Sequence, residues 1–304
     1  MLEFYFSFLP IFFFAAGGFF LKKLFREKIC ERTIIFLNIY FFQSILAIWG
    51  FSTAKIDAAV FWCGAVHFSI LIFALAILFF LARFFFCDPK MRAIFAFAPT
   101  NGNTGNFGIP LGIFLFGAQS IIFTTIINFV NIFWNFVFGV YFFSRGNFSV
   151  RKSIANIFKL PILYFSVFAI FLNFVNFKFP PKIFSLLEIG AHAAIALQIF
   201  LIGVFSAKIN FRQIFSKINF SIIFLKIFLL PIFGFCTIFF AKNFFDFPPI
   251  FAQILLLQLA VPAAVNNFNL AKIFDCRAEI VAEIVFLSTI FFIFLSPLFL
   301  YFLF

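Results

Sequence analysis

Apolar runs of about 20 residues, the length at which a helix can cross the hydrocarbon core of a bilayer, recur along the whole chain. Composition agrees, since 65% of the 304 residues are hydrophobic and the mean hydropathy is +1.18. We therefore predict an all-α polytopic membrane protein in a lipid bilayer. No connector is long enough to hold a further domain. The ten predicted transmembrane helices cover approximately residues 3–21, 33–51, 60–82, 92–117, 120–143, 157–174, 186–206, 219–240, 249–271 and 279–302.

Basic residues alternate between the two sides of these ten spans. The formal net charge is +12, and all but four of the 22 Lys and Arg residues fall on one side. The four exceptions are Lys55, Lys178, Lys182 and Lys242. By the positive-inside rule, the basic side is cytoplasmic and both termini lie outside. The asymmetry explains the basic charge without a nucleic-acid partner and predicts a multi-pass protein of the cytoplasmic (inner) membrane.

Residues that could carry covalent or metal chemistry are scattered. The five cysteines lie singly, without the CxxC or CxxH spacing of a metal site or redox motif. His67 and His192 have no ligand-spaced partners. We therefore expect no metal, no cofactor and no enzyme. The first span begins without a basic n-region, so we do not expect it to be a cleaved signal peptide.

The fourth span contains a polar, glycine-rich interruption at residues 101–110, which read NGNTGNFGIP. In a helix, each glycine costs about 1 kcal/mol relative to alanine and a proline about 3 kcal/mol. Opened backbone cannot face lipid, so the segment must lie within the bundle or against a water-filled cavity. A kink that serves only close helix packing is one interpretation. The amide and hydroxyl side chains favour a binding site, with candidate residues Asn101, Asn103, Thr104 and Asn106.

Two further groups of asparagines lie at membrane depth. The ninth span is interrupted at Pro262, which is followed by Asn266, Asn267 and Asn269. In the fifth span, the spacing of Asn128, Asn131 and Asn135 places all three on one face of a helix. Helix–helix hydrogen bonding and substrate lining are both open for this stripe. We include all six asparagines among the candidate substrate-binding residues.

The chain divides into two halves of five spans, residues 1–148 and 149–304, and the fourth span of each half is broken near a proline. An odd number of spans per half gives the halves opposite orientations. This is the inverted-repeat design of secondary transporters, whose site lies where discontinuous helices cross. We expect Gly108, Pro110 and Pro262 to set the crossing. Both asparagine clusters lie on the cytoplasmic side of their prolines. Lys226, in the eighth span, is expected to extend toward the cytoplasm.

Several short motifs lie near the two breaks and in the last span: Asn103-Thr104, Gly108-Ile109-Pro110, Pro262-Ala263, Asn266, Leu270-Ala271, Asp275, Leu287-Ser288-Thr289 and Pro297. With these motifs the chain resembles the auxin efflux carrier family, which comprises plant PIN proteins and bacterial permeases. Gln43 and Ala196 stand where relatives often carry prolines, and the long cytoplasmic loop of many plant members is absent. The resemblance is therefore to a short prokaryotic-type permease.

The resemblance implies a ten-helix fold similar to that of bile acid–sodium symporters. Spans 1, 2, 6 and 7 would form a scaffold, and spans 3–5 and 8–10 a transport domain that moves by an elevator mechanism in a homodimer. It implies a small organic anion as substrate, such as malate, malonate or an auxin-like acid. Helix N-termini and amide donors suit such an anion. A non-transporting membrane receptor or sensor with the same fold is the alternative.

Overall fold

A computed structural model describes residues 9–53, 55–144, 151, 158, 161–207, 214–243 and 247–303. Within these ranges the chain is helical, and its extended pairing is an isolated bridge between Gly102 and Ala263. Residues 3–8 of the first predicted span and the predicted boundary between the halves, at residues 148 and 149, lie outside the described residues.

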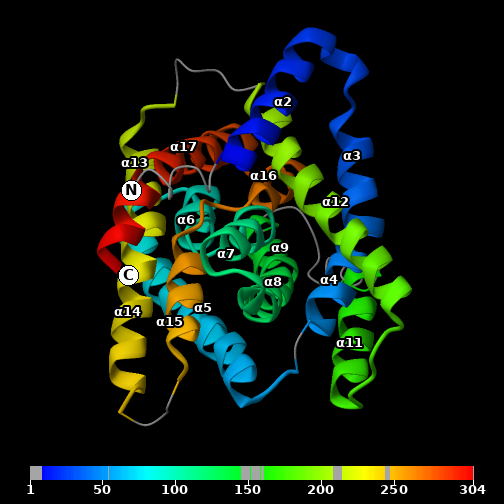
Figure 1. The fold of residues 1–304 in the computed structure, drawn as a ribbon. Coiled ribbons are helices and arrows are strands. Elements are labelled where there is room, and N and C mark those ends of the chain that lie inside the picture. The colour runs from blue at the N-terminus through cyan, green and yellow to red at the C-terminus, as the bar shows by residue number, and fades with distance from the viewer. Residues whose placement is uncertain are drawn as a thin grey trace.

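Helical segments of the first half follow the predicted spans, with the expected interruption after residue 97 (Figure 1). They are α2 (Leu9–Phe25), η1 (Arg26–Lys28), α3 (Glu31–Leu37), η2 (Asn38–Phe42), α4 (Gln43–Ser52), α5 (Ala58–Phe85), α6 (Pro89–Phe97), η3 (Thr104–Gly108), α7 (Ile109–Phe116), η4 (Ala118–Ser120), α8 (Ile121–Trp134), η5 (Asn135–Gly139) and α9 (Val140–Phe143).

The second half is interrupted at the corresponding place, after residue 260. Its segments are α11 (Pro161–Phe174), α12 (Pro181–Ser206), α13 (Lys217–Phe224), η6 (Leu225–Leu229), α14 (Leu230–Ala241), α15 (Pro249–Ala260), α16 (Val265–Ile273) and α17 (Ala278–Leu303).

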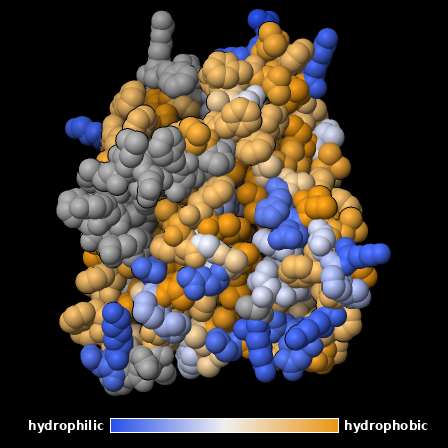
Figure 2. Space-filling model, viewed as in Figure 1, coloured by the Kyte–Doolittle hydropathy of each residue, from blue (hydrophilic) through white to orange (hydrophobic). Residues whose placement is uncertain are grey.

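In the part of the chain that the structure describes, five continuous helical stretches are long and apolar enough to cross a bilayer, among them α5 and α12. Three shorter apolar helices are Thr104–Phe116, Pro161–Phe174 and Pro249–Ala260. Large hydrophobic side chains on the surface are strongly exposed, for example Phe13 at 74% and Phe294 at 75%. On the described part of the face in Figure 2, hydrophobic residues cover the middle, and hydrophilic ones gather mostly toward the bottom. The chain is therefore an all-α membrane protein, and the count of ten crossings stays a prediction.

Prolines mark where several helices begin, because the first turn of a helix does not need their missing N–H. Pro89, Pro161, Pro181 and Pro249 open α6, α11, α12 and α15. The described residues contain four π turns: η2, η5 and η6 lie within helices, and η3 begins one. Such turns are frequent at functional sites. Three of these four contribute residues to the polar cavity described below.

The first helix is longer than predicted. It was expected to end at residue 21, but α2 continues to Phe25. Lys22 is only 5% exposed, and its Nζ donates to the carbonyl oxygens of Arg26 and Ile29, both at 2.8 Å. The same ammonium pairs with Glu31 at 2.8 Å. A cation that satisfies carbonyls at a helix C-terminus stabilises that end, so the helix extends past the apolar run.

One group of helices consists of α2, α4, α11 and α12, which pack against one another and lie on the right in Figure 1. The backbones of α2 and α12 touch. A Cβ built on Gly18 would collide with the carbonyl oxygen of Phe200, and one on Gly203 with that of Ala15. Small residues permit this approach in membranes, where close packing drives helix association.

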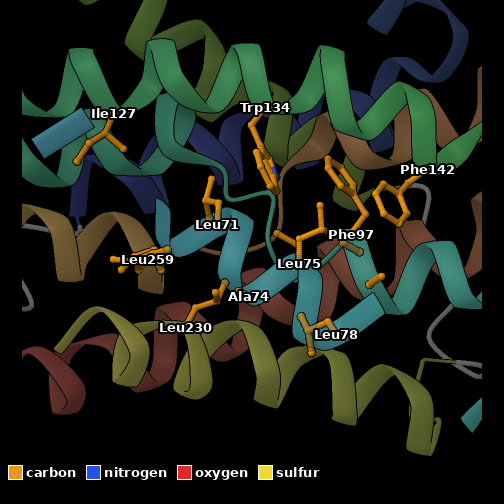
Figure 3. Packing of buried hydrophobic residues seen from close by; sticks show 14 of the residues in the cluster. Leu71, Ala74, Leu75, Leu78, Phe97, Ile127, Trp134, Phe142, Leu230 and Leu259 are labelled. Atoms are coloured by element: carbon orange, nitrogen blue, oxygen red, sulfur yellow. The ribbon is translucent and has the colours of Figure 1, made fainter. Parts of the chain in front are cut away.

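The second group is built around α5, which packs against α6, α8 and α14. Figure 3 shows Leu71, Leu75 and Leu78 of α5 inside one buried apolar cluster that also contains Trp134 of α8 and Leu230 of α14. The interrupted helices α6–α7 and α15–α16 belong to this group. Of these, α6, α7 and α15 pack against α5 or α8 of their own group, and η3, at the start of the α7 helix, contacts α12 of the first group.

Two ion pairs join the start of α6 to the segment that follows α16, at the ends of the interrupted helices that lie away from the breaks. Arg277, after α16, bonds Asp88, the N-cap of α6, through Nη2 at 2.7 Å and Nε at 2.8 Å. Lys90 pairs with Asp275 at 3.1 Å. Partial burial alone would raise the pKa of Asp88. The hydrogen bond from the Lys90 N–H and the Arg277 charge outweigh it, so that pKa lies below its ordinary value.

We expect Gly18→Ala to destabilise the protein by about 1–3 kcal/mol, because the new methyl group meets the backbone of α12. The matched control is Gly17→Ala, since a Cβ there has nothing within 4 Å. Thermal unfolding in detergent measures both. Equal melting temperatures for the two variants would contradict the close α2–α12 contact.

A second expectation concerns acid. Because the pKa of Asp88 is lowered in the fold, the stabilisation from its ion pair is present above about pH 4 and is lost as pH falls below that value. Asp88→Asn should therefore flatten the decline in melting temperature between about pH 5 and pH 3. Asp275→Asn should change it less, since the Asp275 carboxylate is 88% exposed. A decline of unchanged steepness in Asp88→Asn would contradict this.

Candidate substrate-binding site

The two chain breaks cross and bind each other through their backbones. The Asn103 N–H donates to the carbonyl oxygen of Pro262 at 2.8 Å, and the Ala264 N–H donates to that of Asn101 at 2.9 Å. These two bonds form the antiparallel bridge between Gly102 and Ala263. Backbone groups that neither helix can satisfy are thereby paired inside the protein, as a membrane interior requires.

A buried asparagine network holds the crossing from one side. The Asn101 Nδ2 donates to Oδ1 of Asn135 and of Asn267, both at 2.7 Å. Asn131 donates to Oδ1 of Asn101 at 3.1 Å and to the Gly102 carbonyl at 2.6 Å. Asn101 thus connects α8, η5 and α16 to the first break. Asn131 and Asn135 of the fifth span therefore make hydrogen bonds between segments, one of the two roles left open above, and substrate lining stays a prediction.

The carbonyl ends of the interrupted helices receive donors of different charge. Beyond the end of α6, the Ala98 carbonyl accepts from Nδ2 of Asn267 at 3.3 Å. Near the end of α15, the Leu259 carbonyl accepts from Nζ of Lys226 at 3.1 Å. These groups belong to helix C-termini, which carry partial negative charge. One end is therefore capped by a neutral amide and the other by a lysine.

A polar cavity lies beside the crossing and encloses about 760 Å³ of empty space, counted out to its open mouth. Its lining contains no charged side chain. The lining residues are Asn38, Gln43, Gly102, Asn103, Thr104, Gly105, Asn106, Asn128, Asn131, Ile132, Asn135, Phe136, Ile162, Leu201, Phe205, Ala264, Val265, Asn266 and Asn269.

Two helix N-termini contribute to this lining. Residues 103–106 start the helix that continues through α7, and residues 264–266 start α16. The first N–H groups of a helix have no intrahelical partner, and the aligned peptide dipoles place partial positive charge there. Neither start has a side-chain cap. The cavity therefore faces the positive ends of both interrupted helices.

Some amide atoms of the cavity wall have no hydrogen-bond partner. Among the described residues they are Nδ2 of Asn103, Nδ2 of Asn135, Oδ1 of Asn131 and Oδ1 of Asn38, on residues that are 6%, 2%, 6% and 4% exposed. A buried polar group without a partner costs roughly 1–3 kcal/mol, so its presence needs a reason. Two of these four atoms are N–H donors and two are carbonyl oxygens. The wall therefore has free donors as well as free acceptors for a ligand.

The predicted site residues fall into two places. The cavity is lined by Asn103, Thr104, Asn106, Asn128, Asn131, Asn135, Asn266 and Asn269. Asn101 and Asn267 are fully buried behind it and bind each other. Of the predicted crossing residues, Pro262 supplies a bridging carbonyl, Pro110 follows π turn η3, and Gly108 packs on the Gln258 amide. Contact with substrate stays a prediction for all of them.

Sequence reasoning missed other residues of the wall. Asn38 and Gln43, from the second predicted span, line the cavity opposite the breaks. Both are polar within an apolar run, a signal that could have identified them. The expectation for Lys226 was wrong: its side chain is 1% exposed and lies against the crossing, so it does not extend to the surface.

The two histidines lie apart from the cavity. His67 is 1% exposed, and neither ring nitrogen has a hydrogen-bond partner. His192 packs against Trp49, with ring centroids 5.5 Å apart. Among the described residues, no cluster of three His, Cys, Asp or Glu side chains could hold a metal ion.

A helical membrane protein with two interrupted helices crossing beside a polar cavity has the architecture of a secondary transporter. Comparison with protein families agrees. A family model described as membrane transport protein matches residues 147–300, just over half of the chain. The chain belongs to this family, that of the auxin efflux carriers. It is a family of transporters rather than enzymes, and the match does not favour the receptor alternative. No curated protein matches the chain.

Asn101→Ala should lower stability by at least about 1–3 kcal/mol, because it strands the Asn131 and Asn267 amides in the core. Asn106→Ala is the matched comparison. Asn106 lines the same cavity but is half-buried, and its side chain makes no hydrogen bond to any residue that the structure describes. Thermal unfolding should therefore separate the two variants. Similar losses would contradict a purely structural role for Asn101.

Proposed function

We propose that this protein is a secondary transporter that carries a small organic anion across the membrane. The observation that carries the proposal is the unpartnered, buried Nδ2 donor of Asn103 in a cavity that also faces two helix N-termini. Carboxylates are pure acceptors when ionised. Amide donors and positive dipole ends match them, and no carboxylate of the lining would repel them.

The helix packing supports movement of two bodies. The cavity takes Asn38, Gln43, Ile162, Leu201 and Phe205 from the group of α2, α4, α11 and α12, with its η2 turn. The rest of its wall comes from the crossing and from the α8–η5 helix. We propose that the first group is the scaffold (spans 1, 2, 6 and 7) and the second the transport domain. An elevator movement would then carry the lined cavity past the scaffold.

The proposal includes ten crossings, an inverted repeat, both termini outside and a location in the inner membrane as part of a homodimer. On that topology, the residues of the cavity at 103–106 and 264–269 lie on the cytoplasmic side of Pro110 and Pro262. We infer that the polar site is offset toward the cytoplasm. Malonate and malate are the first substrates to test, since each presents carboxylates to several amide donors.

Uptake of radiolabelled malonate, malate and an indole carboxylate into proteoliposomes tests the proposal. We expect saturable flux of at least one anion. Asn103→Ala should weaken its apparent affinity about 10- to 100-fold, since a hydrogen bond to a charged group contributes roughly 1.5–3 kcal/mol. Sodium and pH gradients, applied one at a time, identify the driving ion.

The control variant is Asn243→Ala, at an exposed position at the end of α14. It should leave uptake unchanged. Equal uptake by Asn103→Ala and the parent protein would refute the site. Anion binding without flux would instead favour the receptor alternative.

A further inference from the structure

A lysine is buried behind the crossing. Lys226 lies in π turn η6, and its side chain is 1% exposed. Its Nζ donates to the Leu259 carbonyl, and among the described residues it has no carboxylate partner. Placing an unpaired ammonium in the interior of a membrane protein is costly, and such residues are usually functional.

Gly102 lies against both this ammonium and the cavity. A Cβ built on Gly102 would lie 2.9 Å from Nζ of Lys226. Gly102 also lines the cavity, and its carbonyl accepts a hydrogen bond from Asn131, another lining residue. A positive charge behind this part of the wall acts on the cavity through the protein interior, where the dielectric constant is low and screening is weak.

Capping a helix end does not by itself require a charge here. The Ala98 carbonyl, beyond the end of α6, accepts from the neutral amide of Asn267. A glutamine or asparagine could serve the Leu259 carbonyl in the same manner. The ammonium at the second position therefore supplies a full positive charge in addition to a hydrogen bond, whereas the side chains of the cavity lining are uncharged.

We propose that Lys226, in its charged form, supplies the positive charge that makes this neutral amide cavity select anions over uncharged molecules of the same shape. The inference concerns the site of the proposed function and deepens it. Lys226 acts here as a specificity-determining residue that does not touch the substrate.

A single cysteine at Asn106 or Asn266 reports the electrostatic potential of the cavity without any substrate. Both positions are half-buried and line it. The exposed cysteines Cys30, Cys87 and Cys236 are first replaced by serine. Reaction rates are then measured with an anionic and a cationic methanethiosulfonate reagent. Their ratio cancels changes in thiol reactivity and reports the local charge.

Lys226→Gln keeps an N–H donor for the Leu259 carbonyl and removes the charge. We expect it to lower the anionic-to-cationic rate ratio at least about tenfold, as removal of a unit charge behind the wall implies. Lys226→Arg keeps the positive charge and should therefore keep the rate ratio of the parent protein. The matched control is Lys22→Gln. Lys22 is another buried lysine that donates to backbone carbonyls, and it lies in α2, outside the cavity lining. It should leave the ratio unchanged.

A second measurement uses ligands of graded charge: malonate, its monoamide and its diamide. Loss of affinity in Lys226→Gln should grow with ligand charge and vanish for the neutral diamide. An equal loss for all three, or an unchanged reagent ratio in folded Lys226→Gln, overturns the proposal. If no malonate compound binds the parent protein, the proposed substrate class fails, while the reagent ratio still decides the role of Lys226.

Discussion

Two backbone hydrogen bonds at the helix crossing support the rest of this structure. Both interrupted helices open their backbone at membrane depth, where no water is available to satisfy it. Asn103 and Ala264 donate to Pro262 and Asn101 across the crossing, so each break supplies what the other lacks. Because the breaks satisfy each other, two half-helices can begin and two can end in the protein interior. The two helix starts form part of the cavity wall.

The four ends are sorted by charge. The N-termini that begin at residues 104 and 265 face the cavity without side-chain caps. The carbonyl ends of α6 and α15 point at donors of the protein itself, the Asn267 amide and the Lys226 ammonium. Partial negative charge is thus neutralised internally and partial positive charge is left for a ligand. The same arrangement explains how a wall without charged side chains can suit an anion.

Much of the site could be predicted because its signals are local. Glycine, proline and asparagine within an apolar run disfavour a helix that faces lipid, so residues 101–110 and the break at Pro262 were recognisable. Assigning roles within the cluster was not possible. Asn101 and Asn267 are 166 positions apart, yet they bind each other and lie behind the cavity wall. Gly17 and Gly18 are neighbouring glycines that the sequence cannot tell apart. Of the two, only Gly18 lies against a neighbouring backbone.

By itself, the sequence determined that this chain is a helical membrane protein, where its helices are interrupted and which polar residues lie near the breaks. Those properties follow from hydrophobic length and from the intrinsic cost of glycine and proline in a helix. Tertiary structure decided which asparagines hold the crossing and which line the cavity. It also placed Lys226 inside the protein rather than at its surface, because the Leu259 carbonyl and the gap beside Gly102 accept its ammonium. Such contacts depend on segments that only the folded chain brings together.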